Sequence, residues 1–206
     1  MIFPEGLPRM DDQTLAAYNR AADEFAEDWH TQPTGTDLHA LVRRFFSPGP
    51  TADIGCGSGR DTAWLTQNGF PTIGYDPSTG LLTEARRRHP GLRFERAALP
   101  ELDAVPDSSL TNVLCETVIM HLEPAALAPA VRKLIAILEP GGTLYLSWRV
   151  TQGTDQRDEH GRLYAAFDAA VITDALSTAN ILLDEETTSA SSGKTVHRII
   201  ARNVQP

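Results

Sequence analysis

Three glycines at alternate positions, Gly55, Gly57 and Gly59, follow a short apolar run at residues 51–54. Glycine adopts backbone conformations that a Cβ atom would forbid, so this spacing indicates a tight turn that a ligand can approach closely. Residues 60–67 then have the pattern of a helix, which ends at the stop signal Asn68-Gly69. A strand, a glycine turn and a helix in this order are typical of the first unit of an open α/β sheet.

The rest of the chain continues this alternation of short apolar runs with helical patterns, which predicts a parallel sheet with crossover helices. Before residue 51, apolar residues at helical spacing predict two helices separated by Pro33-Thr34-Gly35. Near the end, two strands joined through Ser191-Ser192-Gly193 predict a hairpin, so the last strand should run antiparallel. The expected strands are 51–54, 71–75, 92–95, 110–115, 143–148, 181–187 and 195–201, and the expected helices are 60–67, 78–88, 123–138 and 168–179.

Composition limits the class of protein. A chain of 206 residues, 41% of them hydrophobic, is large enough for one core and is expected to form a single domain. The formal net charge of −9 argues against a nucleic-acid partner, because phosphate contacts come from clustered Lys and Arg. We find no membrane-length apolar run and no signal-peptide pattern, so we expect a cytoplasmic monomer or homodimer without a membrane partner. Cys56 and Cys115 lack metal-binding spacing and are expected to be free thiols.

Asp76 stands at the end of the second expected strand, 19 residues after Gly57. A carboxylate at this position can accept hydrogen bonds from both hydroxyls of a ribose, so the glycine turn and Asp76 together predict an adenosine pocket. The alternative is a glycine turn that only connects a strand to a helix. It gives no reason for the carboxylates of Asp53 and Asp76 at the ends of apolar strands, where burying a charge is costly.

The glycine loop itself separates two classes of adenosine-bearing cofactor. A dinucleotide site has the pattern G-x-G-x-x-G, which requires a glycine where this chain has Arg60. Asp61 places a carboxylate in the first turn of the helix, where it would repel a pyrophosphate but suits a cationic amino acid. A nucleotide-cofactor oxidoreductase is therefore the disfavoured alternative.

Three segments resemble the class I S-adenosylmethionine-dependent methyltransferases, namely DIGCGSGRD at 53–61, GYDPS at 74–78 and LEPGGTL at 138–144. The resemblance implies a Rossmann-like, doubly wound α/β fold with a seven-stranded sheet, mostly parallel, whose last strand is antiparallel and lies beside the fifth. It also implies S-adenosyl-L-methionine as the cofactor and S-adenosyl-L-homocysteine as its product. Residues 1–50 would then form a helical cap, 51–150 the cofactor-binding core, and 151–206 the acceptor-site loop, a helix and the C-terminal hairpin.

The resemblance also implies roles for individual residues. Gly55 and Gly57 would line the methionine part of the cofactor, and Asp53 would lie near its amino group. Members of the family usually offer an acidic residue to the adenine, where this chain has Ala98 and Leu99. The full expected cofactor-binding set is Tyr18, Asp53, Gly55, Cys56, Gly57, Arg60, Asp61, Asp76, Pro77, Ala98, Leu99, Glu116, Thr117 and His121.

In-line displacement at a sulfonium requires an aligned acceptor and, where that acceptor is protonated, a base, but no metal. His121, Glu116 and Tyr164 are the candidate catalytic residues, although a histidine at a helix start also commonly bonds to the backbone.

The candidate substrate-binding residues for a small-molecule acceptor are Trp29, Trp148, Arg149 and Arg162. The aromatic residues also fit a core, and the arginines also fit a solvated loop of mutual ion pairs. A non-catalytic S-adenosylmethionine-binding module is the second alternative, and it predicts that residues 149–164 fill the acceptor cavity.

Overall fold

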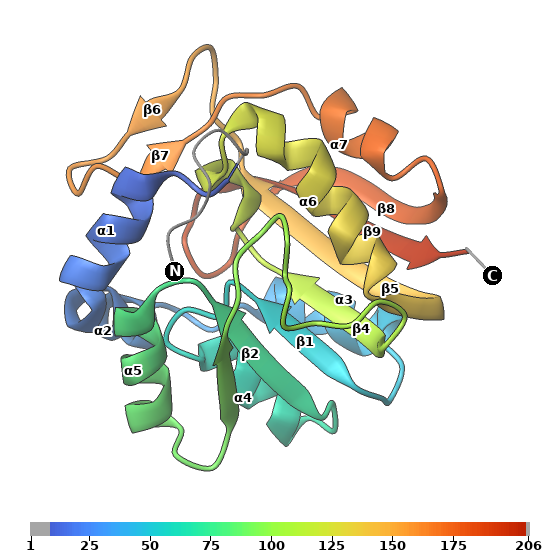
Figure 1. The fold of residues 1–206 in the computed structure, drawn as a ribbon, viewed down its shortest axis with the longest axis horizontal. Helices are drawn as coiled ribbons and strands as arrows, with labels where there is room; N and C mark the ends of the chain where they lie inside the picture. The colour runs from blue at the N-terminus through green and yellow to red at the C-terminus, as the bar shows by residue number, and fades with distance from the viewer. Residues whose placement is uncertain (1–8, 205–206) are drawn as a thin grey trace.

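The computed structural model of the protein describes residues 9–204 and is built around a seven-stranded sheet with the order β3-β2-β1-β4-β5-β9-β8 (Figure 1). The strands of this sheet are β1 (Thr51–Ile54), β2 (Thr72–Asp76), β3 (Arg93–Arg96), β4 (Leu110–Cys115), β5 (Leu138–Arg149), β8 (Ala179–Thr188) and β9 (Thr195–Asn203). The helices are α1 (Asp12–Arg20), α2 (Ala22–Thr31), α3 (Thr36–Phe45), α4 (Arg60–Gln67), α5 (Thr79–Arg88), α6 (Pro124–Ala136) and α7 (Ala170–Ala175), with the 3₁₀ turn η1 (Ile119–His121). Among residues 9–204, no helix combines the length and hydrophobicity needed to cross a membrane.

Strands β1 to β5 pair in parallel, and β9 lies antiparallel between β5 and β8. This arrangement confirms the predicted Rossmann-like sheet with its last strand beside the fifth. The strand order reverses between β1 and β4, since β2 lies on one side of β1 and β4 on the other. In open α/β sheets, ligands bind beyond the carboxyl ends of the strands at such a reversal.

Helices cover both faces of the sheet. Val113 of β4 lies in a buried cluster with Leu127 of α6 and Ile172 of α7. Leu114, the next residue of the same strand, lies in another cluster with Leu38 of α3. Because successive strand residues point to opposite faces, α6 and α7 cover one face and α3 covers the other.

Between residue 9, where the described part of the chain begins, and β1 there are three helices rather than the two expected. The first two are separated at Ala21, whose φ of −119° and ψ of 35° lie outside the helical region. The sequence has no Pro or Gly at this point. Beside the break, the side-chain oxygen of Asn19 accepts hydrogen bonds from Ser78 Oγ and the Gly80 N–H. A contact between distant segments, which local sequence does not show, therefore accompanies the end of the first helix.

Element boundaries differ from expectation in three further places. β5 begins at Leu138, and a register shift opposite β4 accommodates residues 140–142 within the strand. α7 is shorter than the expected 168–179 because β8 already begins at Ala179. The segment after β5, expected as a polar loop, contains a small antiparallel pair, β6 (Gln156–Arg157) and β7 (Leu163–Tyr164).

Candidate active site

A cavity of about 390 Å³ lies where the strand order reverses, beyond the ends of β1, β2, β4 and β5. Most of the residues that the sequence singles out line it. These are Tyr18, Trp29, Gly55, Cys56, Gly57, Arg60, Asp61, Asp76, Pro77, Glu116, Thr117, His121, Arg149, Arg162 and Tyr164. The fold therefore brings the predicted cofactor and acceptor residues to one cavity.

The glycine turn leaves no room for a side chain at Gly57. Its φ of +54° is the left-handed region that favours glycine, and a Cβ placed there would lie 2.8 Å from the indole ring of Trp29. Arg60, at the start of α4, donates a hydrogen bond from Nη1 to the carbonyl of Trp29 at 3.1 Å. The end of α2 is thus held against the glycine turn, and Trp29 forms a wall of the cavity.

Asp76 is fixed beside this turn by two backbone amides. The Gly57 N–H donates to Oδ2 at 3.0 Å, and the Ser78 N–H donates to Oδ1 at 2.8 Å. Burial raises the pKa of Asp76 to about 6, although both hydrogen bonds lower it. Each carboxylate oxygen has further acceptor capacity, so Asp76 can accept hydroxyl groups from a ligand in the cavity.

Asp53 lies beneath the turn instead of lining the cavity, because it accepts a hydrogen bond at 2.6 Å from Thr62 Oγ1 of α4. Burial, followed by the neighbouring Asp61 carboxylate, raises the pKa of Asp53. Asp61 itself lines the cavity. Acidic groups near a helix N-terminus disfavour phosphate and favour a cation, so the residues present fit a phosphate-free, positively charged nucleoside.

A second, smaller cavity of about 20 Å³ lies beside the first and has a mostly apolar lining that includes Pro77, Leu99 and Val118. It is the position where the resemblance implies an adenine. Ala98 lines neither cavity, and its carbonyl accepts a hydrogen bond from the Leu102 N–H at 2.8 Å. Leu99 is therefore the better placed of the two predicted adenine residues.

Glu116 and Thr117 follow β4 and are held by Ser147 of β5. The Ser147 hydroxyl donates to Glu116 and accepts from the Thr117 N–H at 3.1 Å. Burial raises the pKa of Glu116. Thr117 has a φ of +54°, which is unusual for a β-branched residue, and such strain is found most often at functional sites.

His121 is buried, and both of its ring nitrogens have protein partners. Nδ1 lies 2.5 Å from the carbonyl oxygen of Leu163, which can only accept, so Nδ1 carries the proton. Burial lowers the pKa of His121 to about 4, which keeps the ring neutral. Nε2 therefore accepts a hydrogen bond from the Tyr18 hydroxyl at 2.9 Å. The lone pair that a general base would need is already engaged.

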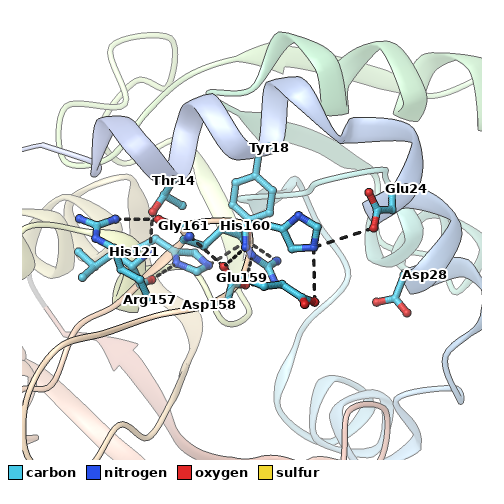
Figure 2. Close-up of polar contacts among 12 residues, drawn as sticks. Thr14, Tyr18, Glu24, Asp28, His121, Arg157, Asp158, Glu159, His160 and Gly161 are labelled. Carbon is cyan, nitrogen blue, oxygen red and sulfur yellow. Dashed lines mark hydrogen bonds and ion pairs between the residues drawn. The ribbon is translucent and has the colours of Figure 1, made fainter.

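The same contacts fasten α1 to the β6–β7 segment, as Figure 2 shows with Thr14 and Tyr18 pointing toward His121 and Arg157. The Leu163 N–H donates to Thr14 Oγ1 at 2.8 Å. Asp11 forms an ion pair with Arg157 at 2.7 Å, and the hydrogen bond from Arg157 lowers the pKa of Asp11 to about 2. These contacts connect the helical cap to the segment that follows β5.

Arg149, Arg162 and Tyr164 form the side of the cavity after β5. The Arg162 guanidinium pairs with Asp158 at 2.6 Å, as expected for a loop of mutual ion pairs, and lies over the ring of Phe25 at 4.4 Å. The Arg149 guanidinium lies 4.8 Å from the centre of the Tyr164 ring. Arg149, Arg162 and Tyr164 are therefore the residues of the segment 149–164 that line the cavity.

Trp148 does not line the cavity, which differs from the prediction that it contributes to the acceptor site. It is 3% exposed and stacks on His197 with ring centres 4.4 Å apart. Trp148 and His197 are paired across β5 and β9, so their side chains share one face of the sheet. Arg149, the next residue, points to the other face and reaches the cavity.

The sequence of this chain is similar to those of known methyltransferases. A family model for a methyltransferase domain matches residues 52–142. A trans-aconitate 2-methyltransferase from Methylobacterium nodulans is 36% identical over 140 residues, which cover 66% of this chain and 49% of that protein. Residues 52–142 form a methyltransferase domain of the class I, S-adenosylmethionine-dependent type.

One further curated relative and one solved structure extend the comparison. A malonyl-[acyl-carrier protein] O-methyltransferase from Enterobacter lignolyticus is 28% identical over 165 residues, covering 79% of this chain and 62% of that protein. The 1,6-didemethyltoxoflavin-N1-methyltransferase of Burkholderia thailandensis, solved with its acceptor and S-adenosylhomocysteine, has a TM-score of 0.69 at 20% identity, covering 100% of this chain and 94% of that one. This structural likeness concerns the fold. The chain spans about half the length of the first curated relative.

Sequence reasoning missed one part of the methyltransferase cavity, the turn between β8 and β9. Ser189, Ser191, Ser192, Lys194 and Val196 all line the cavity. The signal was present, because a hairpin whose second strand is antiparallel beside β5 puts its turn at the carboxyl end of β5. Other lining residues that the sequence did not indicate include Asp28 of α2 and Gln32, which follows the end of that helix.

Proposed function

We propose that this protein transfers the methyl group of S-adenosylmethionine to a small-molecule acceptor by in-line displacement. The cofactor supplies an electrophilic methyl group on a positively charged sulfur. The observation that carries the proposal is Asp76, which two backbone amides hold at the glycine turn beside the acidic start of α4. This arrangement suits a ribose and a cationic amino acid and leaves no site for a pyrophosphate.

The cofactor-binding residues follow from their positions in the cavity. Asp76 would bind the ribose hydroxyls, and the backbone at Gly55 and Gly57 would contact the methionine portion. Asp61 would face the amino group, while Pro77 and Leu99 would pack on the adenine. The family membership and these positions support S-adenosylmethionine together.

The acceptor atom is a carboxylate oxygen. His121 Nε2 is engaged by Tyr18, and burial raises the pKa of Tyr164, so neither residue supplies a free base at neutral pH. Glu116, which accepts from Ser147, is the remaining candidate. A carboxylic acid is already deprotonated at that pH and needs no base. The names of the two curated relatives, which specify trans-aconitate and a malonyl group, support the same class.

The alternative of a non-catalytic binding module predicts that residues 149–164 fill the acceptor cavity. Arg149, Arg162 and Tyr164 are the residues of this segment that line the cavity, and turnover measurements distinguish the two alternatives. We further propose that residues 1–206 act as a single domain in the cytoplasm, as a monomer or homodimer without a nucleic-acid or membrane partner. The net charge of −9 supports the absence of a nucleic-acid partner.

Two measurements test the proposal. Calorimetry with S-adenosylhomocysteine should give a defined Kd, and NADH should give no heat. Incubation of the protein with S-adenosylmethionine and a panel of carboxylic acids, amines and thiols should yield methyl esters, detected by mass spectrometry. Absence of S-adenosylhomocysteine binding at millimolar concentration would refute the cofactor assignment, and methylation confined to amines or thiols would refute the acceptor class.

A further inference from the structure

Two cationic side chains in the cavity have no acidic partner. Four basic residues line it, and Arg60 and Arg162 are paired with Asp61 and Asp158 respectively. Within residues 9–204, Arg149 and Lys194 form no ion pair. An unpaired guanidinium and an unpaired ammonium in one cavity provide sites for an anionic ligand.

The sheet register places these two cations on the same face of the sheet. Arg149 is paired directly with Val196 across β5 and β9, so the two side chains point to the same face. Lys194 precedes Val196 by two residues, and the Val150 N–H bonds to the carbonyl of Thr195 at 3.1 Å, which continues the pairing toward the turn. Arg149, Lys194 and Val196 all line the cavity, with Lys194 exposed at its mouth.

The turn that carries Lys194 is held in place before any ligand binds. The Ser189 N–H donates to the carbonyl of Lys194 at 2.9 Å, and the Gly193 N–H donates to the carbonyl of Ser189 at 2.9 Å. From outside the turn, Asp37 of α3 accepts from the Ala190 N–H at 3.3 Å and from the guanidinium of Arg198 at 2.6 Å. A fixed turn loses little conformational freedom on binding, so its cation is suited to select a ligand.

The unpaired cations lie apart from the glycine turn. Asp61, which is paired with Arg60, and Asp76 line the cavity at that turn, whereas Arg149 and Lys194 come from the end of β5 and the β8–β9 turn. Asp28 and Glu116 also line the cavity. A positively charged cofactor suits the acidic part, and an anion suits the basic part. Hydroxyl groups of Ser189, Ser191 and Ser192 line the cavity near Lys194 and can donate hydrogen bonds to an anion.

We propose that Arg149, Lys194 and the serine-rich turn 189–194 bind a second carboxylate of the acceptor, remote from the one that is methylated. The acceptor is therefore a compound with at least two carboxylates, and Lys194 determines specificity without contacting the reacting atoms. This inference rests on the proposed methyl transfer to a carboxylate. It assigns the C-terminal hairpin turn to acceptor selection.

The test measures binding of dicarboxylates, from succinate to adipate, and of their monoamides to protein saturated with S-adenosylhomocysteine. The best dicarboxylate should bind the unmodified protein at least tenfold more tightly than its monoamide. The ratio of the Kd of the monoamide to the Kd of the dicarboxylate measures this preference. In Lys194→Gln the ratio should fall at least threefold, and in Arg149→Gln it should approach one. Lys194→Arg should retain the preference, because the charge is kept.

Lys133→Gln is the matched control, since Lys133 is the only other lysine of the chain and pairs with Asp107 on the exposed end of α6. It should leave the ratio unchanged. All four variants should bind S-adenosylhomocysteine with the Kd of the unmodified protein and unfold at a similar temperature, which excludes misfolding as the cause.

Each other outcome overturns the inference in a recognisable way. Equal binding of dicarboxylates and monoamides, or no binding of either, would show that a second carboxylate site is absent. Weaker binding of S-adenosylhomocysteine to Lys194→Gln would assign Lys194 to the carboxylate of the cofactor. Tighter, Lys194-dependent binding of the matching phosphono acid would identify a phosphate site instead. If the unmodified protein fails to bind S-adenosylhomocysteine at all, the proposed function fails, independently of Lys194.

Discussion

The hydroxyl of Tyr18 lies 2.9 Å from Nε2 of His121 and joins the first helix of the cap to the turn after β4. The carbonyl of Leu163 holds the opposite ring nitrogen. Burial lowers the pKa of His121 to about 4 and raises the pKa of Tyr18. Both groups are therefore neutral at physiological pH, and their contact organises the cavity without supplying a base.

Replacing Tyr18 with Phe should lower the free energy of unfolding by about 1–2 kcal/mol, because His121 Nε2 would remain buried without its donor. At saturating cofactor, kcat with a carboxylic acid should change by less than about tenfold, since no proton has to be removed. Urea denaturation and steady-state kinetics check the two parts. A loss of two orders of magnitude in kcat at unchanged cofactor affinity would instead place Tyr18 and His121 in a proton-transfer step.

The depressed pKa of His121 predicts how stability depends on pH. The folded protein disfavours a charged ring, whereas the unfolded chain protonates it near the ordinary value of 6.5. The contribution of His121 to the free energy of unfolding is therefore complete above about pH 6.5 and is lost as the pH falls toward 4. Relative to His121→Gln, the unmodified protein should lose on the order of 3 kcal/mol across this interval.

Urea denaturation of both proteins between pH 7.5 and 4 measures this difference. Asp53 and Asp76, whose raised pKa values act in the opposite direction, are common to both proteins and cancel in the comparison. Parallel stability curves for the two proteins would mean that the folded state accepts a charged His121.

Gly57→Ala should weaken binding of S-adenosylhomocysteine by at least tenfold, because the new Cβ would meet the ring of Trp29 and alter the wall of the cavity. Gly69→Ala is the matched control. Gly69 also has a positive φ, +91°, but a Cβ there would have no atom within 4 Å. Both variants should be destabilised by about 1–2 kcal/mol, and only Gly57→Ala should lose affinity in calorimetry. If Gly57→Ala and Gly69→Ala bound S-adenosylhomocysteine with equal affinity, the glycine turn would not take part in cofactor binding.

Asp76→Asn should reduce affinity for S-adenosylhomocysteine by roughly 10- to 100-fold, the usual loss for one charge-assisted hydrogen bond of 1.5–3 kcal/mol. The amide would also direct an NH₂ group toward one of the two backbone N–H donors, from Gly57 or Ser78. Thermal shifts with added ligand provide the measurement. An unchanged ligand-induced rise in Tm would remove Asp76 from the binding site.

The parts of the fold and site that the sequence predicts are those encoded by local residues. The glycine turn, Asp76 at the end of β2 and the short C-terminal hairpin each follow from nearby residue types, and the predicted position of the last strand is confirmed. Turn chemistry and strand periodicity act over a few residues, so a single sequence carries them directly.

Features that depend on distant contacts could not be predicted in this way. The break at Ala21 occurs beside the contact of Asn19 with α5, and the partners of His121 lie 103 and 42 positions away in the chain. Trp148 and Arg149 have equally plausible chemistry for a pocket, and only the register of β5 against β9 determines which of them faces it. Lys194 reaches the cavity only because β9 pairs antiparallel with β5, which brings the β8–β9 turn to the carboxyl end of β5.

The insertion of β9 between β5 and β8 also has a consequence during synthesis. Until residues 195–203 have left the ribosome, the backbone edge of β5 has no neighbour on that side. The seven residues of β5 that pair with β9, Thr143–Arg149, would until then be an unpaired edge and a template for pairing with other nascent chains. The sheet is therefore complete only after β9 has been translated, and chaperone protection of the β5 edge would matter most until then.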